Sequence, residues 1–316
     1  MENKIPHSFA RKTKKSLIIN EHYTAMQKFK DVQSEAPESN YRLDRVGLTN
    51  VTRPITVQRK KKTITLIPTF RVFVDLPPSR KGSDLSRDIE AVEDVVEGEV
   101  EGRTKGIEYV AELIVEKLLA RHPYATSAEA ELTADYFLER TNPKGRKTTE
   151  RYLIKGKAIK RDGEKAKRYI GITATGITVC PSAMKTVSAL MNRKVDSPPY
   201  ISHNQRNDVS ILMEVPHGWD VEVNELIDIA EQSMSAPTYE LLKREEEGML
   251  VLQAHQNPKF VEDAVRDAVK LIVKRYAKMP DDVSVKVTSE SFETIHKHNA
   301  FAEKSGTLGA LRSELS

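Results

Sequence analysis

The chain has 316 residues, 39% of them hydrophobic, which is enough to bury one large core or two modest ones. Its 50 basic and 46 acidic residues leave a formal charge of only +4, and 6% aromatic content argues against a nucleic-acid partner. We find neither an apolar run of about 18 residues nor a secretory leader pattern, so we expect no membrane partner and a cytoplasmic location.

The first half of the chain begins with a polar segment, residues 1–40, which lacks sustained periodicity and is interpreted as an N-terminal extension. Alternating apolar and polar residues predict a strand over 70–76, paired with a strand over 51–57. Helical spacing of apolar residues then predicts helices over 83–96 and 107–122.

The remaining elements follow in a similar order. We predict strands over 128–138 and 150–159, strands over 169–180 and 209–215, helices over 222–234 and 258–276, and a strand over 283–287. The pattern indicates an α+β fold made of two tandem ββααββ-like repeats with antiparallel sheets, residues 41–160 and 161–316. Open sheet edges favour aggregation, so closing several such sheets into an oligomeric barrel is a physical remedy.

Metal-capable side chains are scattered over the second half. They are Cys180 in TVCPSA, His203 in SHNQR, Glu247 in YELLKREEE, and Glu293, His296 and His298 in ETIHKHNA. A thiolate, imidazoles and a carboxylate suit a catalytic divalent metal. The single cysteine also excludes an intrachain disulfide and suits a reducing compartment.

Local sequence gives each of these residues an expected setting. Cys180 precedes Pro181, which ends strand pairing and places the thiol at a strand-to-loop junction. Three glutamates ending at Glu247 stand before Gly248, which we interpret as a helix end. His296 and His298 follow a strand at an i, i+2 spacing, so extended geometry would put both rings on one face, with Glu293 out of phase.

Several strings together resemble a known family. VGLTNVTRPITV, VDLPPSRKGSDLSRDIEAVEDVV, TVCPSA, HNQR, YELLKREEE, NPKFVEDAVRDA and FETIHKHNAFA are similar, in this order, to the metal-dependent type IB GTP cyclohydrolases, above all to their archaeal MptA-type branch. The resemblance runs from about Val46 to Ala302. It implies the tunnelling fold, GTP as substrate, and a homo-oligomer, dimer or tetramer, with active sites between subunits.

The resemblance also implies roles for the metal-capable residues. It makes Cys180, His203, Glu247 and His296 the metal ligands, with Fe²⁺ as the metal and Zn or Mn as alternatives. Cys180 is in addition catalytic, His298 transfers protons, and Glu293 is an active-site acid or orients His296. The chain departs from the family at Ser182, where a second cysteine is more common, and in the longer segment between Cys180 and His203.

Substrate-binding residues are expected on both halves. Glu262 lies beside the apolar stripe of the helix that Asn257 and Pro258 are expected to begin, and it matches the glutamate that anchors the purine in this fold. A carboxylate there can accept two hydrogen bonds from guanine. The cationic candidates for the phosphates are Arg206, which could instead contact a subunit, and Lys81 and Arg87 of KGSDLSR beside the Gly82 backbone.

The expected reaction is hydrolytic opening of the guanine imidazole ring with loss of formate. An MptA-like enzyme would form 7,8-dihydroneopterin 2',3'-cyclic phosphate for methanopterin or pterin biosynthesis, and a bacterial-type enzyme would form dihydroneopterin triphosphate. A nitrile reductase-like enzyme of the same fold would need Cys180 without the metal histidines. A non-enzymatic RNA- or nucleotide-binding module is the alternative of a different class.

Overall fold

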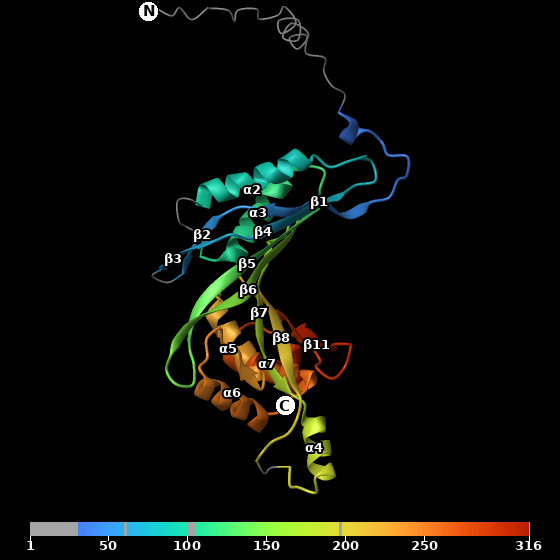
Figure 1. Cartoon of the computed structure of the whole chain (residues 1–316). Helices are drawn as coiled ribbons and strands as arrows, with labels where there is room; N and C mark the ends of the chain where they lie inside the picture. The colour runs from blue at the N-terminus through green and yellow to red at the C-terminus, as the bar shows by residue number, and fades with distance from the viewer. Residues whose placement is uncertain (1–30, 60–61, 100–104, 196–197, 316) are drawn as a thin grey trace, which may run out of the picture.

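A computed structural model describes residues 31–59, 62–99, 105–195 and 198–315, so most of the predicted 1–40 extension lies outside the described residues. A long, twisted antiparallel sheet runs through the molecule and is covered by helices (Figure 1). Its strand order is β1-β4-β5-β6-β7-β8-β10-β11, with the short β9 paired to β7. The α+β class is therefore confirmed.

The strands are β1 (Leu43–Thr52), β2 (Ile55–Arg59), β3 (Lys62–Leu66), β4 (Thr69–Leu76), β5 (Ser127–Thr141), β6 (Lys147–Arg161), β7 (Lys167–Val179), β8 (Asn204–Val215), β9 (Ala236–Pro237), β10 (Ser284–Ser291) and β11 (Ala300–Thr307). The helices are the 3₁₀ turn η1 (Val32–Ser34), α2 (Leu85–Glu99), α3 (Ile107–Arg121), α4 (Pro181–Leu190), α5 (Val223–Ser233), α6 (Arg244–Gln256), α7 (Val261–Arg275) and α8 (Leu308–Leu315). None of the helices in the described part of the chain is long and apolar enough to cross a membrane.

The core lies between the sheet and the helices packed on it. Helix α3 packs on β5 and β6, α5 on β7, and α7 on β10 and β11. Ile114 and Leu118 of α3 are completely buried, as are Leu226 and Ile227 of α5. Along β6, buried residues alternate with exposed or half-buried ones, so the other face of the sheet stays open.

The strand predicted over 51–57 is in fact two strands. β1 ends at Thr52 after pairing with β4, and β2 begins at Ile55 and pairs with β3 in a separate hairpin. Pro54 lies between them and has no backbone N–H to continue a ladder. The hairpin partner β3 was not predicted.

Two predicted helix boundaries are wrong. Gly248 lies inside α6, because Glu246 accepts a hydrogen bond from the Lys243 backbone N–H and so marks the first turn, not the last. Asn257 caps the end of α6, and α7 begins only after Phe260. The Asn257 side chain instead donates to the carbonyls of Met234 and Ser235, which anchors the segment between the two helices.

The surroundings of the predicted site also contain elements that were not predicted. Cys180 lies at a strand-to-helix junction, not a strand-to-loop junction, because Pro181 is the first residue of α4. The elements β11 and α8 follow the terminal histidine motif. Figure 1 shows α4 projecting from one end of the molecule, far from α2 at the opposite end.

Candidate functional site

Three adjacent strands bring Cys180, His203 and Glu293 to one sheet end. Thr178 of β7 pairs with Gln205 of β8, and beyond them the Cys180 N–H donates to the His203 carbonyl at 3.2 Å. Directly opposed residues of an antiparallel pair point to the same face, as do residues two apart on one strand. The side chains of Thr178, Cys180, His203 and Gln205 therefore form one square patch.

Cys180 is fixed by the start of α4. Its backbone is extended, with φ −69° and ψ 114°, and its Sγ accepts a hydrogen bond from the Ala183 N–H at 3.3 Å. The thiol is partly exposed. The sulfur therefore lies at the N-terminus of α4, and sulfur is the atom through which a cysteine binds a metal or attacks an electrophile.

Within the described residues, the polar contacts of the His203 ring are all made by Nδ1. This atom lies 2.9 Å from Gln205 Oε1, 3.4 Å from Thr294 Oγ1 and 3.9 Å from Glu293 Oε2. Glu293 is itself held by the Ser291 hydroxyl, which donates to Oε1 at 2.7 Å. Acceptors around Nδ1 favour a proton there, which leaves the lone pair of Nε2 for a ligand.

The two terminal histidines are exposed and lie on the loop between β10 and β11. Their rings stack with centroids 5.0 Å apart and planes inclined by 10°. They therefore share one face as predicted, although residues 292–299 are bent and not extended. Glu293 points to His203 and not to this pair.

The predicted carboxylate ligand and its neighbour on α6 differ in their surroundings. Glu247 is exposed, whereas Glu246 is buried and is contacted by the Lys243 amide and by Arg146 Nε at 3.2 Å. The Lys243 amide hydrogen bond, together with Arg146, holds the pKa of Glu246 below its usual range. His255 lies near the other end of α6, about 12 Å along the helix axis from Glu247, and contacts the Ser202 carbonyl at 3.4 Å.

The chemistry of the patch fits a borderline divalent metal, since it offers a thiolate sulfur and an imidazole Nε2. Within the described ranges, however, no three His, Cys, Asp or Glu side chains already surround one point. The structure thus brings Cys180 and His203 together, with Glu293 beside them. It leaves Glu247 on α6 and His296 on an exposed loop.

Glu262 is exposed in the first turn of α7 and lines a groove of about 380 Å³. The groove is also lined by Val265 and Val269 of α7 and by Leu311 of α8, so the predicted apolar surroundings are present. Just before the helix, the Lys259 N–H donates to the Val179 carbonyl at 3.0 Å. This bond joins the start of α7 to the strand end that carries Cys180.

Arg206 is exposed on β8 and lines a polar pocket of about 520 Å³ with Tyr152, Glu231 and Tyr239. Tyr152 and Arg140 both donate to the Glu231 carboxylate. Burial raises the pKa of Glu231, even though these two partners act in the opposite direction. Among the described residues, none forms an ion pair with the Arg206 side chain, so its guanidinium can contact an anion.

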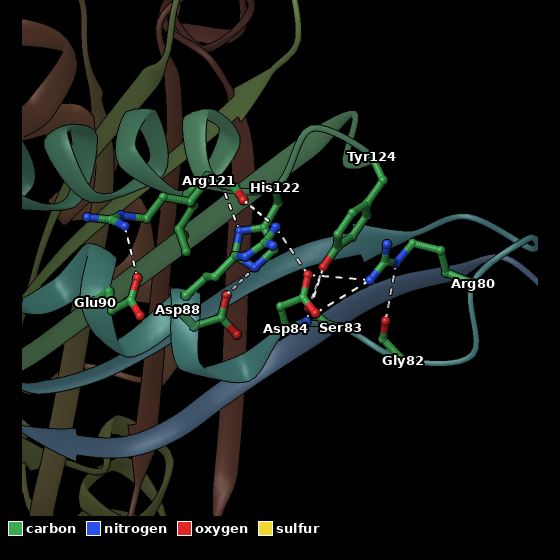
Figure 2. Close-up of polar contacts among 11 residues, drawn as sticks. Arg80, Gly82, Ser83, Asp84, Asp88, Glu90, Arg121, His122 and Tyr124 are labelled. Carbon is green, nitrogen blue, oxygen red and sulfur yellow. Dashed lines mark hydrogen bonds and ion pairs between the residues drawn. The ribbon is translucent and has the colours of Figure 1, made fainter. Parts of the chain in front are cut away.

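The predicted phosphate loop leads into α2, which lies at the opposite end of the molecule from α4 (Figure 1), and part of the loop is drawn in Figure 2. The Gly82 N–H already donates to the Gln33 carbonyl at 3.2 Å, so it is not free to approach an anion as expected. Arg87 contacts Asp84 at 3.2 Å and the Arg121 carbonyl at 3.0 Å. The Lys81 side chain is exposed.

A buried pair that was not predicted supports this loop (Figure 2). His122 Nε2 lies 3.2 Å from Asp88 Oδ1, and both side chains are 0% exposed. His122 Nδ1 lies 2.9 Å from the Leu118 carbonyl oxygen. Burial, with a smaller contribution from Asp84, raises the pKa of Asp88 to about 7.

Solved structures show the same fold. The chain superposes on uricase from Arthrobacter globiformis with a TM-score of 0.51 at 7% identity, covering 84% of this chain and 93% of that one. At this identity the similarity concerns the fold, which is that of uricase-like tunnelling-fold proteins.

Sequence comparison identifies the family. GTP cyclohydrolase MptA of Methanococcus aeolicus is 39% identical over 307 residues, covering 91% of this chain and 99% of that protein. GTP cyclohydrolase MptA of Methanothermobacter thermautotrophicus is 40% identical, covering 91% and 96%. The model of the family "Type I GTP cyclohydrolase folE2" matches residues 29–302. The chain therefore belongs to the type I GTP cyclohydrolase (FolE2) family.

Proposed function

We propose that the protein hydrolyses GTP to 7,8-dihydroneopterin 2',3'-cyclic phosphate with release of formate, as a step of methanopterin or pterin biosynthesis. The family match over residues 29–302 carries the cyclohydrolase assignment. Relatives that are 39–40% identical and named GTP cyclohydrolase MptA support the archaeal product over the triphosphate.

We propose Fe²⁺ as the resident metal, with Zn or Mn as alternatives, held by Cys180, His203, Glu247 and His296. Support comes from the adjacent Cys180 and His203 and from the lone pair that His203 Nε2 presents. When bound, such a metal supplies Lewis acidity and lets water ionise near neutral pH. Glu247 and His296 would have to approach this pair in the assembled enzyme.

The remaining residues of the second half can bind the base and move protons. Glu262 lies beside an apolar groove and can accept both hydrogen bonds from the N1–H and 2-amino edge of guanine. His298 is exposed beside His296, and its imidazole is the proposed proton-transfer group. Glu293 is held next to His203 and supplies a carboxylate at the same sheet end.

We further propose that the protein is a homo-oligomer, dimer or tetramer, whose sites lie between subunits. Helix α2, which carries Arg87 and follows Lys81, lies at the opposite end of the molecule from α4, which Cys180 caps (Figure 1). One chain therefore cannot present both these cations and the metal ligands to one GTP molecule. The strands β1 and β11 end the strand order and have no partner on their outer side within the described ranges. Pairing these edges between copies would close a barrel.

The decisive experiment is anaerobic incubation of metal-stripped protein with GTP and Fe²⁺, Zn²⁺ or Mn²⁺. Formate is quantified, and mass spectrometry distinguishes the cyclic phosphate from the triphosphate. We expect formate and cyclic phosphate in equal amounts, with Fe²⁺ giving the highest rate. Absence of formate with every metal would refute the reaction, and a triphosphate product would refute only the product.

A further inference from the structure

Gln205 lies two residues after His203, near the start of β8, and its side chain contacts the His203 ring on the same face of the sheet. We infer that Gln205 is a positioning residue, which holds the proton of His203 on Nδ1 and thereby keeps Nε2 bare for the metal. This inference rests on the proposed function of the site.

Both polar ends of the Gln205 side chain make a contact, and the side chain is buried. Its Oε1 lies 2.9 Å from His203 Nδ1, and its Nε2 donates to Thr178 Oγ1 at 3.1 Å. Gln205 is 6% exposed and Thr178 is 0% exposed. Thr178 and Gln205 are directly paired across β7 and β8, so the strand pairing holds the Thr178 hydroxyl next to the Gln205 side-chain amide.

The surroundings determine the direction of the hydrogen bond. If the amide were turned round, its NH₂ group would point at His203, and Nδ1 would have to be the acceptor. The Glu293 carboxylate 3.9 Å from Nδ1 argues against this, because an acceptor-only group favours a proton on the nitrogen that it faces. The Thr178 hydroxyl can accept from the amide, so both ends of Gln205 are satisfied in the direction described.

This direction has a chemical consequence. A neutral histidine side chain in water prefers its proton on Nε2. This is the nitrogen whose lone pair the metal would need from His203. A contact that holds the proton on Nδ1 reverses the preference and also prevents the ring from turning over. Partners of this kind typically change metal affinity by about 10- to 100-fold when removed.

The test compares Gln205→Glu, which keeps an acceptor for Nδ1–H, with Gln205→Met, which keeps the length but removes it. Thr178→Val is a milder variant that loosens the amide, and Asn204→Ala, at an exposed neighbour facing the other way, is the control. Nitrogen NMR of histidine-labelled, metal-free protein reports which His203 nitrogen carries the proton, at a pH where the imidazole is neutral. His203→Ala assigns the signal, and the Fe²⁺ and Zn²⁺ dissociation constants are measured in parallel.

We expect Nδ1–H in wild type, Gln205→Glu and Asn204→Ala. Gln205→Met should move the proton toward Nε2 and weaken metal binding about 10- to 100-fold, with Thr178→Val in between. Nε2–H in the wild type, or Nδ1–H and unchanged affinity in Gln205→Met, would overturn the inference. If Gln205→Met fails to fold, an unchanged Thr178→Val overturns it. If Gln205→Met moves the His203 proton from Nδ1 toward Nε2 but the wild-type protein binds no metal, the positioning role is supported and the metal site is refuted.

Discussion

The molecule contains two histidine–carboxylate pairs, one at each end of the sheet, and they use the ring differently. His122 and Asp88 are 3.2 Å apart with both side chains 0% exposed, whereas His203 and Glu293 are 3.9 Å apart and 14% and 13% exposed. Both nitrogens of His122 face groups of the same chain. In the part of the chain that the structure describes, the polar contacts of the His203 ring are all made by one nitrogen, Nδ1.

The difference teaches how to separate a structural histidine from a ligand. A ring whose two nitrogens are both engaged internally has no lone pair for a substrate or metal. A ring with one engaged nitrogen is oriented and still available. The pair at His122 should therefore matter for stability, and the pair at His203 should matter for chemistry.

The largest effect is expected at the sheet end that carries Cys180 and His203. Cys180→Ala and His203→Ala should each abolish turnover and reduce bound metal, because each removes a proposed metal ligand. A loss of activity beyond about 100-fold distinguishes a direct ligand from a residue that only positions one. Their melting temperatures should stay near that of the wild type, since both side chains lie at a partly exposed sheet end. Ser182→Ala, in the same motif, is the matched control. Full metal occupancy and activity in both variants would contradict the site.

At the buried pair the effect should fall on stability instead. Asp88→Ala or His122→Ala should lower the free energy of unfolding by about 3–5 kcal/mol, because a buried polar group loses its partner. Denaturant titration measures this change. Glu90→Ala removes only the exposed contact with Arg121 and should cost less than about 1 kcal/mol. Equal effects of the two kinds of variant would contradict the distinction.

The buried pair should also give stability a specific pH dependence. The pKa of Asp88 is raised to about 7, so between pH 4 and 7 the folded state binds more protons than the unfolded state. Its contribution is therefore complete below about pH 4 and is lost as the pH rises through 7, by at most about 1.4 kcal/mol per pH unit.

Asp88→Asn retains a donor toward His122 and cannot ionise, so it isolates this contribution. The wild type should lose stability relative to Asp88→Asn as the pH rises from 5 to 8, as measured by denaturant titration at each pH. Parallel curves would show that Asp88 is already ionised in the folded protein at pH 5, which would contradict the raised pKa.

The smallest effect separates the two neighbouring glutamates of α6. Glu246→Gln should lower the melting temperature by roughly 2–4 °C, because it weakens the cap at Lys243 and the contact with Arg146. Glu247→Gln should leave the melting temperature unchanged and reduce metal occupancy. The reverse result would move the proposed ligand by one residue.

The sequence predicted the regular elements better than the positions between them. The strand at 70–76 and the helices at 107–122 and 222–234 follow from periodicity alone, and β4, α3 and α5 confirm them. Gly248 and Asn257 misled because their signals are local, whereas a cap at Lys243 and bonds to Met234 and Ser235 decide the helix boundaries.

Contacts between distant residues were beyond reach for a different reason. Asp88 lies on α2 and His122 directly follows α3, and no periodicity relates them. The pairing of Cys180 with His203 depends on the β7–β8 register, which the intervening α4 and its loop do not reveal. Gln205 lies two residues from His203, but the predicted strand begins only at residue 209, so the sequence did not show that the two side chains share a face of β8.

The bond from the Lys259 N–H to the Val179 carbonyl bears on how this enzyme tolerates mutation. It sets the spacing between the start of α7, which carries Glu262, and the strand end that carries Cys180. Because both atoms belong to the main chain, nineteen of the twenty amino acids at position 259 keep the donor, and only proline removes it. The distance between Glu262, the proposed nucleobase anchor, and the Cys180 thiol can therefore be inherited unchanged while the side chains at positions 179 and 259 diverge.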